Sequence, residues 1–421
     1  MKGFQMHVLD IIRTHLLALP ILIKTALLLA IIVGVPPICR IVKLPAVVGL
    51  ILAGLVVGPH GLDFFGKDRP VVDFFAELGK LLLLFSAGLE VDLALFRKAR
   101  NKSVTFGVLT ALLPLLLGTG VAALFGYSII AAIVIGSLLA SHTLLGLPIL
   151  TRLGATHLEP VTVTVGATVM SDIFSLIVFA ICLSTFRNGF SALSVATQLI
   201  EIAIFVPFIL LGVSWLGAWL LKKVEKNEDA YFVVMIVILA AAGAIADRIN
   251  LPGIVGAFLA GLAVNKATQN NPAKEKLQFF GNSLFIPIFF IVTGFLINPP
   301  SFITTISSNF PLVAAIILAL LVGKGIASEL TGRSFGYSAA ARKTVWSLTL
   351  PQVAATLAAA LVAYQTLNPA GQRLLDDKMM NVVLVLMLTT AIGGPILTER
   401  FAPQMLPEDT PLTSSGGTRA S

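Results

Sequence analysis

Charged residues are scarce in this sequence. Asp, Glu, Lys and Arg make up 12% of its 421 residues, roughly half the share found in soluble proteins, whereas 57% of the residues are hydrophobic and the mean hydropathy is +0.96. No polar stretch within the chain is long enough for a soluble domain, and the longest one follows Glu399. These scarcities exclude a water-soluble enzyme and a disordered chain, and they indicate a polytopic membrane protein.

Cysteine is nearly absent as well. Cys39 and Cys182 lie in separate apolar segments and match no metal or redox spacing, so we expect two buried residues and no cofactor. The net charge of +8 is typical of basic cytoplasmic loops and does not indicate a nucleic-acid partner. Residues 1–19 are expected to form an amphipathic lead-in without a signal cleavage site, and residues 399–421 a disordered cytoplasmic tail.

The apolar runs are unbroken and about 20 residues long, which predicts helices and excludes the alternating strands of a membrane barrel. The region 20–398 holds thirteen such runs, so the predicted fold is an all-α polytopic membrane protein with 13 transmembrane helices. The segments are 20–39, 44–59, 71–91, 103–125, 128–151, 157–184, 195–221, 230–247, 251–265, 277–297, 308–331, 344–364 and 378–397.

Basic residues are divided unequally between the two sides that these segments define. Most of the 29 lysines and arginines, including those within 97–102, 222–226, 266–276 and 333–343, fall on the side that holds the C-terminus. Because cytoplasmic loops carry the excess of basic residues, we expect the C-terminus in the cytoplasm and the N-terminus outside. The expected location is a bacterial-type inner membrane.

Part of the sequence is repeated at an offset of about 207 residues. Leu44–Val57 reads LPAVVGLILAGLVV and Leu251–Val264 reads LPGIVGAFLAGLAV, with nine of fourteen positions identical. Ser141–Leu144 recurs as Ser347–Leu350 at nearly the same offset. Because the matches keep one register, they indicate an internal duplication.

The two repeats cover about 20–184 and 230–397, and a linker helix at 195–221 joins them. Seven segments separate equivalent positions, and since seven is odd, the repeats enter the membrane from opposite sides. Inverted-topology repeats of this kind are typical of secondary transporters, because one sequence then supplies two oppositely facing states.

Polar residues interrupt two apolar segments, 128–151 and 344–364, at equivalent positions of the repeats. Those residues are Ser141, His142, Thr349 and Gln352. Each segment also contains a proline, so both helices are expected to break in mid-membrane and to line a substrate site. The alternative is a pair of packing kinks, and His142 is expected to be structural.

Segment 157–184 carries an acidic residue at mid-membrane depth. Asp172 lies about fifteen residues into the segment, with Thr168 and Ser171 within about one turn. A carboxylate at that depth is costly unless it is hydrated or paired, which marks a functional residue, although a capping or paired Asp is the alternative. One carboxylate can hold a proton or a monovalent metal cation but not both, and this competition would couple the two.

Lys324 lies deep in segment 308–331, between two glycines. We expect it to compensate the charge of Asp172, with a structural pair to Glu329 as the alternative. Glu77 and Lys80, three residues apart, are expected to pair in the scaffold. No role follows for Glu201.

Four motifs together resemble those of one transporter family. They are Gly54–Pro59 (GLVVGP), Glu77–Glu90 (ELGKLLLLFSAGLE), Gly256–Leu262 (GAFLAGL) and Ile286–Phe290 (IPIFF). Over essentially its whole length the chain is similar to the monovalent cation/proton antiporter superfamily, in the branch that includes the Kef-type and NapA-type exchangers.

This resemblance implies an NhaA/NapA-like antiporter fold. Residues 103–184 and 308–397 would form a core with the two broken helices crossed, and the remaining helices would form a dimerising scaffold past which the core moves like an elevator. The essential aspartate of the family would be Asp172, its basic residue Lys324, and the threonine of its first broken helix Thr143.

The sequence departs from the family at two points. Ser171 precedes Asp172 where electrogenic relatives have a second acid, so we expect Ser171 at the ion site and an electroneutral exchange of one proton per cation. No nucleotide-binding domain follows the last segment, so gating through such a domain is not expected.

The sequence therefore predicts a secondary transporter, not an enzyme, that exchanges Na⁺ or K⁺ for H⁺ across the lipid bilayer as a homodimer. A sodium-coupled solute symporter of similar fold and a gated cation channel are the alternatives. An intramembrane enzyme is the least supported, because no catalytic pairing of residues is evident.

Overall fold

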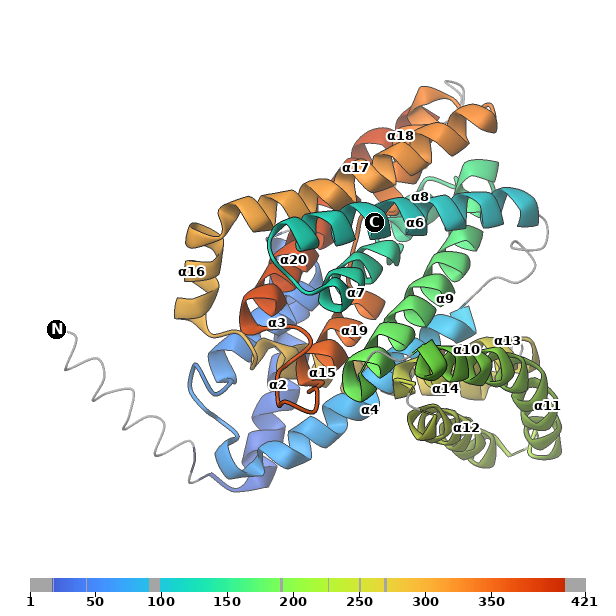
Figure 1. Ribbon diagram of the computed structural model, residues 1–421. Helices are drawn as coiled ribbons and strands as arrows, with labels where there is room; N and C mark the ends of the chain where they lie inside the picture. The colour runs from blue at the N-terminus through green and yellow to red at the C-terminus, as the bar shows by residue number, and fades with distance from the viewer. Residues whose placement is uncertain are drawn as a thin grey trace, which may run out of the picture. The chain divides into compact units, whose positions relative to one another are not determined.

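The computed structural model describes residues 17, 19–42, 44–90, 99–189, 192–225, 227–249, 251–268 and 271–405. Within these ranges the chain forms helices and no strand, apart from an isolated β-bridge between Leu367 and Arg373 (Figure 1). The chain divides into two compact units. The first comprises Met1–Val91, Ala180–Val313 and Ala358–Leu384, and the second comprises Asp92–Phe179, Ala314–Leu357 and Val385–Ser421.

Most helices of the first unit lie wholly within it. They are α2 (Ile21–Ile41), α3 (Ala46–Val57), the 3-10 helix η1 (Gly66–Asp68), α4 (Arg69–Glu90), α10 (Ala192–Pro207), the π-helix η2 (Phe208–Val213), α11 (Ser214–Lys223), α12 (Glu228–Arg248), α13 (Gly253–Thr268), α14 (Pro272–Phe280), the π-helix η3 (Gly281–Phe285), α15 (Ile286–Gly294) and α16 (Pro299–Ser308).

The second unit holds fewer complete helices. They are α6 (Arg100–Leu124), α7 (Ile129–Ala140), α8 (Leu147–Arg152), α18 (Ala339–Leu348) and the 3-10 helix η4 (Ala402–Met405). Four further helices begin in one unit and end in the other: α9 (Glu159–Asn188), α17 (Phe310–Ser334), α19 (Ala354–Gln365) and α20 (Asp377–Phe401).

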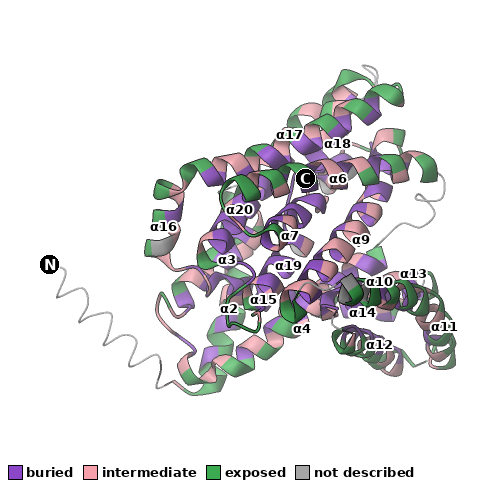
Figure 2. Cartoon of the chain, in the orientation of Figure 1, coloured by how far each residue is buried: buried purple, intermediate pink, exposed green. Residues whose placement is uncertain are grey.

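Within the described ranges, eight helical stretches are long and apolar enough to cross a membrane. They are Ile21–Ile41, Arg100–Leu124, Glu159–Asn188, Leu199–Lys223, Glu228–Arg248, Pro272–Gly294, Phe310–Ser334 and Asp377–Met405. Many of their large apolar side chains are exposed, among them Trp215 and Trp219 of α11. Figure 2 shows exposed residues along α10 and α11. Apolar side chains on the outside of a helix are stable in lipid, so the all-helical, polytopic part of the predicted fold is confirmed.

Helix packing in the first unit depends on pairs of glycines. Gly54 on α3 lies against the carbonyl of Ile291 on α15 so closely that a Cβ atom would not fit. Gly261 on α13 lies equally close to the carbonyl of Phe85 on α4. Small residues at such positions let helix backbones approach closely. Close packing of this kind drives helix association in a membrane, because the hydrophobic effect does not favour helix–helix contact over helix–lipid contact.

The same helix pairs make a second set of glycine contacts. Gly88 on α4 lies against the carbonyl of Phe258, and Gly294 on α15 lies against the carbonyl of Ile51. The two sets of contacts are related by the repeat offset of about 207 residues, which places α3 of the first repeat at the position of α13 and α4 at the position of α15. Helix α3 therefore packs on α15 in the same way as α13 packs on α4.

The predicted ends of the chain differ from the structure in part. Residues 1–16 of the expected lead-in and residues 406–421 of the expected tail lie outside the described residues. Residues 399–405 were expected to belong to that tail, but they continue α20 and form η4. The helix continues because Ala402 is buried against Leu150, Ala155 and Leu348.

Candidate functional site

Both segments that were expected to break are interrupted in the second unit. Helix α7 (Ile129–Ala140) is preceded by the N-cap residue Ser128, whose hydroxyl accepts a hydrogen bond from the N–H of Ala131 (3.3 Å). The next six residues, 141–146, are not helical, and α8 begins at Leu147.

The second interruption has the same construction. Helix α18 (Ala339–Leu348) is preceded by the N-cap residue Ser338, whose hydroxyl accepts a hydrogen bond from the N–H of Ala341 (3.2 Å). Residues 349–353 are not in a helix, and α19 follows them. Serine at the N-cap position favours a helix start, and the proline in this interruption cannot continue a helix.

Hydrogen bonds join the two interrupted segments. The N–H of Thr143 donates to the carbonyl of Pro351 (2.8 Å), and the side-chain amide of Gln352 donates to the carbonyl of Ser141 (2.7 Å). Thr356, at the start of α19, donates to the amide oxygen of Gln352 (2.8 Å). The first two bonds pair backbone groups that the breaks leave without helical partners, as burial requires, and the third holds the Gln352 side chain in place.

Helix α9 is fastened to the first break through His142. The Nε2 atom of His142 lies 3.0 Å from the hydroxyl of Thr168, and its Nδ1 atom lies 3.3 Å from the hydroxyl of Ser171. Ser175 donates to the carbonyl of Ser137 on α7 (2.7 Å). His142 is buried, and both of its ring nitrogens contact hydroxyl groups of α9.

Asp172 follows Ser171 on this face of α9. Its Oδ1 atom is buried and has no hydrogen-bond partner among the described residues. The ammonium group of Lys324 and the backbone of His142 both act on this carboxylate electrostatically. A buried carboxylate oxygen without a donor is costly, so it marks the place where a proton or a cation would be stabilised.

Lys324 makes contacts that the sequence did not predict. Its side chain is fully buried, and Nζ donates to the carbonyls of Thr110 (2.9 Å), Ala140 (2.8 Å) and Ser141 (3.3 Å). Ala140 and Ser141 mark the C-terminal end of α7, where helical carbonyls lack donors and the helix dipole is negative. Lys324 therefore stabilises the end of the broken helix.

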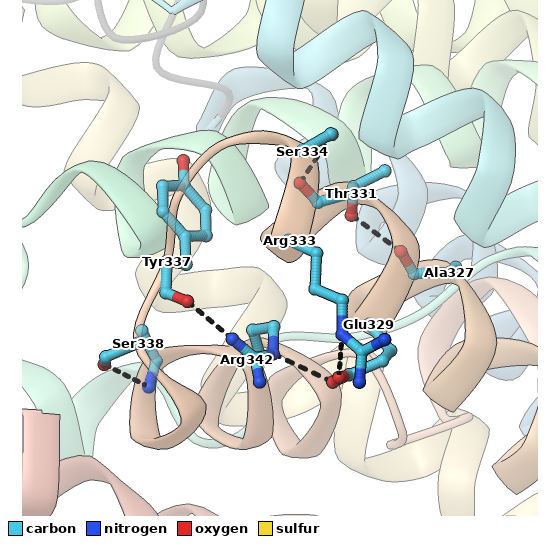
Figure 3. Close-up of polar contacts among 9 residues, drawn as sticks. Ala327, Glu329, Thr331, Arg333, Ser334, Tyr337, Ser338 and Arg342 are labelled. Carbon is cyan, nitrogen blue, oxygen red and sulfur yellow. Dashed lines mark hydrogen bonds and ion pairs between the residues drawn. The ribbon is translucent and has the colours of Figure 1, made fainter.

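The alternative partner of Lys324, Glu329, is engaged elsewhere. Glu329 pairs with Arg333 one turn along α17 (2.7 Å) and with Arg342 on α18 (2.9 Å), as Figure 3 shows.

In the first unit, Lys80 pairs with Glu77 at 2.8 Å, which is the ion pair expected from their spacing.

The second unit thus brings together most of the residues singled out in the sequence. Those joined by the hydrogen bonds above are Ser141, His142, Thr143, Thr168, Ser171, Lys324 and Gln352. Thr349, which directly follows α18, is buried and donates to the carbonyl of Trp346 in the last turn of that helix (3.0 Å). Among the described residues, no three His, Cys, Asp or Glu side chains lie close enough to hold a metal ion together.

Comparison with known proteins agrees with this architecture. Residues 27–402 match the family model described as "Sodium/hydrogen exchanger, transmembrane". The chain is 45% identical to the Na(+)/H(+) antiporter NhaS5 of Synechocystis over 386 residues, which cover 91% of this chain and 55% of that protein. It is 26% identical to the Probable Na(+)/H(+) antiporter 3 of Methanocaldococcus jannaschii over 89% of this chain and 95% of that protein.

A solved structure shares the fold. The sodium proton antiporter MjNhaP1 of Methanocaldococcus jannaschii matches with a TM-score of 0.68 at 16% identity, over 90% of this chain and 96% of that one. The chain belongs to the sodium/hydrogen exchanger family, and the resemblance to cation/proton antiporters is confirmed. The chain spans about half the length of the Synechocystis relative.

Proposed function

We propose that the chain is a secondary transporter that exchanges a monovalent cation, Na⁺ or K⁺, for H⁺ at Asp172. The observation that carries the proposal is the buried Oδ1 atom of Asp172, which has no hydrogen-bond partner among the described residues. Asp172 lies on α9, which is hydrogen-bonded to the first of the two interrupted segments. A carboxylate in this setting is stabilised by a proton or by a small cation. Family membership and the names of the relatives support the same reaction.

Oxygen atoms suited to a monovalent cation are available in this part of the second unit. Carboxylate, hydroxyl and carbonyl oxygens are the ligands that such cations accept in proteins. We propose Asp172 as the charged ligand, with Ser171, Thr143 and the site-lining residues Ser141, Thr168, Thr349 and Gln352 as the surrounding polar residues. Lys324, which also lies near, balances the carboxylate charge when no cation is bound.

The exchange is proposed to be electroneutral. Ser171 occupies the position before Asp172, and its hydroxyl contacts Nδ1 of His142 (3.3 Å). A serine there adds no second charge that a further proton would have to neutralise. One proton released per cation bound is then the simplest stoichiometry.

Alternating access is proposed to arise from inverted repeats within 13 membrane crossings. The reciprocal glycine contacts support a two-fold relation between the repeats, since Gly54 meets Ile291 as Gly261 meets Phe85. The second unit, which holds the site, would carry the bound ion in an elevator-type movement, and the first would form the scaffold of a homodimer.

The proposed orientation follows from the basic residues. The ends of α6, α11 and α17 that carry Arg100, Lys222 and Arg333 would face the cytoplasm, with the N-terminus outside, in a bacterial-type inner membrane.

The test is flux in proteoliposomes with an imposed pH gradient. Proton movement is followed after addition of Li⁺, Na⁺, K⁺ or Rb⁺, with and without an ionophore that clamps the voltage. Asp172→Asn should abolish cation-driven proton flux, whereas Asp229→Asn, at an exposed carboxylate in the first turn of α12, should leave it unchanged. Exchange by Asp172→Asn at the native rate would refute the proposal. Cation current without proton counterflow would indicate a channel. Uptake of Na⁺ together with a solute would indicate a symporter.

A further inference from the structure

Helix α20 presents three small residues to the second interrupted segment. Thr390, Gly394 and Thr398 follow one another at intervals of four residues, which places them on one side of the helix. All three are buried and belong to the second unit. None of them is among the site residues described above.

Two of these residues support the segment by direct contact. Gly394 lies against the ring of Pro351 so closely that a Cβ atom would not fit. The hydroxyl groups of Thr398 and Ser347 lie 2.9 Å apart, and the hydroxyl of Thr398 also lies close to Gly146 of the first interrupted segment. Helix α20 therefore supports the second interrupted segment much as the hydroxyl groups of α9 support the first.

Thr390 makes the contact that concerns the ion site. Its hydroxyl accepts a hydrogen bond from the backbone N–H of Gln352 (3.0 Å) and donates to the carbonyl of Met387 in its own helix (3.3 Å). Gln352 lies in the stretch that is not helical, so its N–H has no helical acceptor. Because Gln352 and Thr390 are both buried, this N–H depends on the hydroxyl of Thr390 for its hydrogen bond.

Gln352 connects Thr390 to the ion site. Its side-chain amide donates to the carbonyl of Ser141 (2.7 Å), and its amide oxygen accepts from Thr356 (2.8 Å). The carbonyl of Ser141 also accepts a hydrogen bond from the ammonium group of Lys324 (3.3 Å). The bond to Thr390 fixes the backbone of Gln352, and the side chain of Gln352 in turn fixes the carbonyl of Ser141.

We propose that Thr390 is a positioning residue for ion exchange, which holds the carbonyl of Ser141 in place at the cation site through Gln352. This inference rests on the proposed exchange at Asp172. A cation is bound by several oxygen atoms at once, and its affinity depends on how precisely the surrounding hydrogen bonds hold them. A proton needs the carboxylate alone. Removal of the Thr390 hydroxyl should therefore weaken binding of the cation more than binding of the proton.

The test is the apparent KM for Na⁺ and for K⁺ in proteoliposomes at one fixed pH. Thr390→Val keeps the side-chain shape but removes the acceptor, so it should raise the KM for the exchanged cation about three- to tenfold at an unchanged maximal rate per folded protein. Thr390→Ser keeps the hydroxyl and should have the native KM. Thr390→Cys, whose sulfur is a weaker acceptor, should lie between the two and decides the question if Thr390→Val does not fold.

A merely structural role of Thr390 predicts a different result. Loss of stability lowers the amount of folded transporter and hence the maximal rate, but it leaves KM unchanged. Thr331→Val is the matched control, at a buried threonine of α17 whose hydroxyl donates to the carbonyl of Ala327 in its own helix, and it should keep the native KM.

The role of Thr390 is overturned if Thr390→Val and Thr390→Cys keep the native KM, or if Thr390→Ser shares the defect of Thr390→Val. Exchange by Asp172→Asn at the native rate would refute the proposed function and this inference together. A native KM in Thr390→Val beside an inactive Asp172→Asn would refute this inference alone.

Discussion

The ammonium group of Lys324 lies 2.9 Å from the carbonyl oxygen of Thr110 and so joins α17 to α6. In a regular helix this carbonyl would accept a hydrogen bond from the N–H of the residue four positions later in the chain. Here that residue is Pro114, which has no N–H. Gly323, the neighbour of Lys324, packs directly on Pro114. Lys324 therefore supplies the donor that the proline withholds, in addition to stabilising the end of α7.

This relationship predicts how two substitutions combine. Lys324→Met should lower the free energy of unfolding by about 1–3 kcal/mol, because it leaves buried carbonyls without donors. Pro114→Ala restores an N–H that can bond to Thr110, so Lys324→Met should cost about 1 kcal/mol less in the Pro114→Ala background. Thermal unfolding of the four proteins in detergent measures the coupling. Strictly additive effects would show that Lys324 does not replace the donor that Pro114 lacks.

Sequence alone could locate Lys324 but not its partners. The position between two glycines in an apolar run identified a costly buried charge, and the expected partners were carboxylates because those are what sequence can pair with a lysine. Backbone carbonyls become available only when a helix breaks or contains proline, and which carbonyl faces which lysine depends on tertiary packing. Pro114 was the signal that could have pointed to Thr110.

The positions of the breaks themselves were predictable, since proline and clustered hydroxyl groups act locally. Their cross-connection was not, because the bond from Gln352 to the carbonyl of Ser141 links residues 211 positions apart. Likewise the repeated glycines could be read from the sequence, but the reciprocal contact of Gly54 with Ile291 required the structure.

Gln352 should hold the two interrupted segments in place. Gln352→Leu keeps the side-chain size but removes the bonds to Ser141 and from Thr356, which should lower the free energy of unfolding by about 2–3 kcal/mol and reduce cation-driven proton flux. Gln404→Leu, at an exposed position in η4, is the matched control and should change neither. If Gln352→Leu transports at the native rate, the hydrogen bonds of Gln352 are not required for transport.

The close glycine contacts predict an equal response in the two repeats. Gly54→Ala and Gly261→Ala each place a methyl group against a carbonyl and should destabilise the chain by about 1–3 kcal/mol. Gly34→Ala, at a glycine of α2 with open space around it, should be neutral or stabilise by up to about 1 kcal/mol. Unfolding midpoints of the three variants test this, and tolerance at one of the two equivalent glycines alone would argue against the reciprocal packing.

The residue before Asp172 should determine the charge moved per cycle. Ser171→Asp adds a second carboxylate that must bind or release its own proton, so transport should become sensitive to voltage, whereas Ser171→Ala should remain electroneutral. The measurement compares flux with and without a voltage clamp in proteoliposomes. A native chain that is itself strongly accelerated by the clamp would contradict the electroneutral proposal.

Competition at Asp172 gives the pH dependence of transport a definite sign. If a proton and a cation share this one carboxylate, as proposed, the protonated site is closed to the cation. Below the pH at which Asp172 titrates, the unprotonated fraction falls about tenfold per pH unit, and the apparent KM for the cation should rise by the same factor. The maximal rate should stay constant, because saturating cation displaces the proton. Initial rates measured over a range of Na⁺ concentrations, at equal pH on both sides of the vesicle membrane, give both quantities. A maximal rate that falls with pH while KM stays fixed would instead mean that the proton binds at a group other than Asp172.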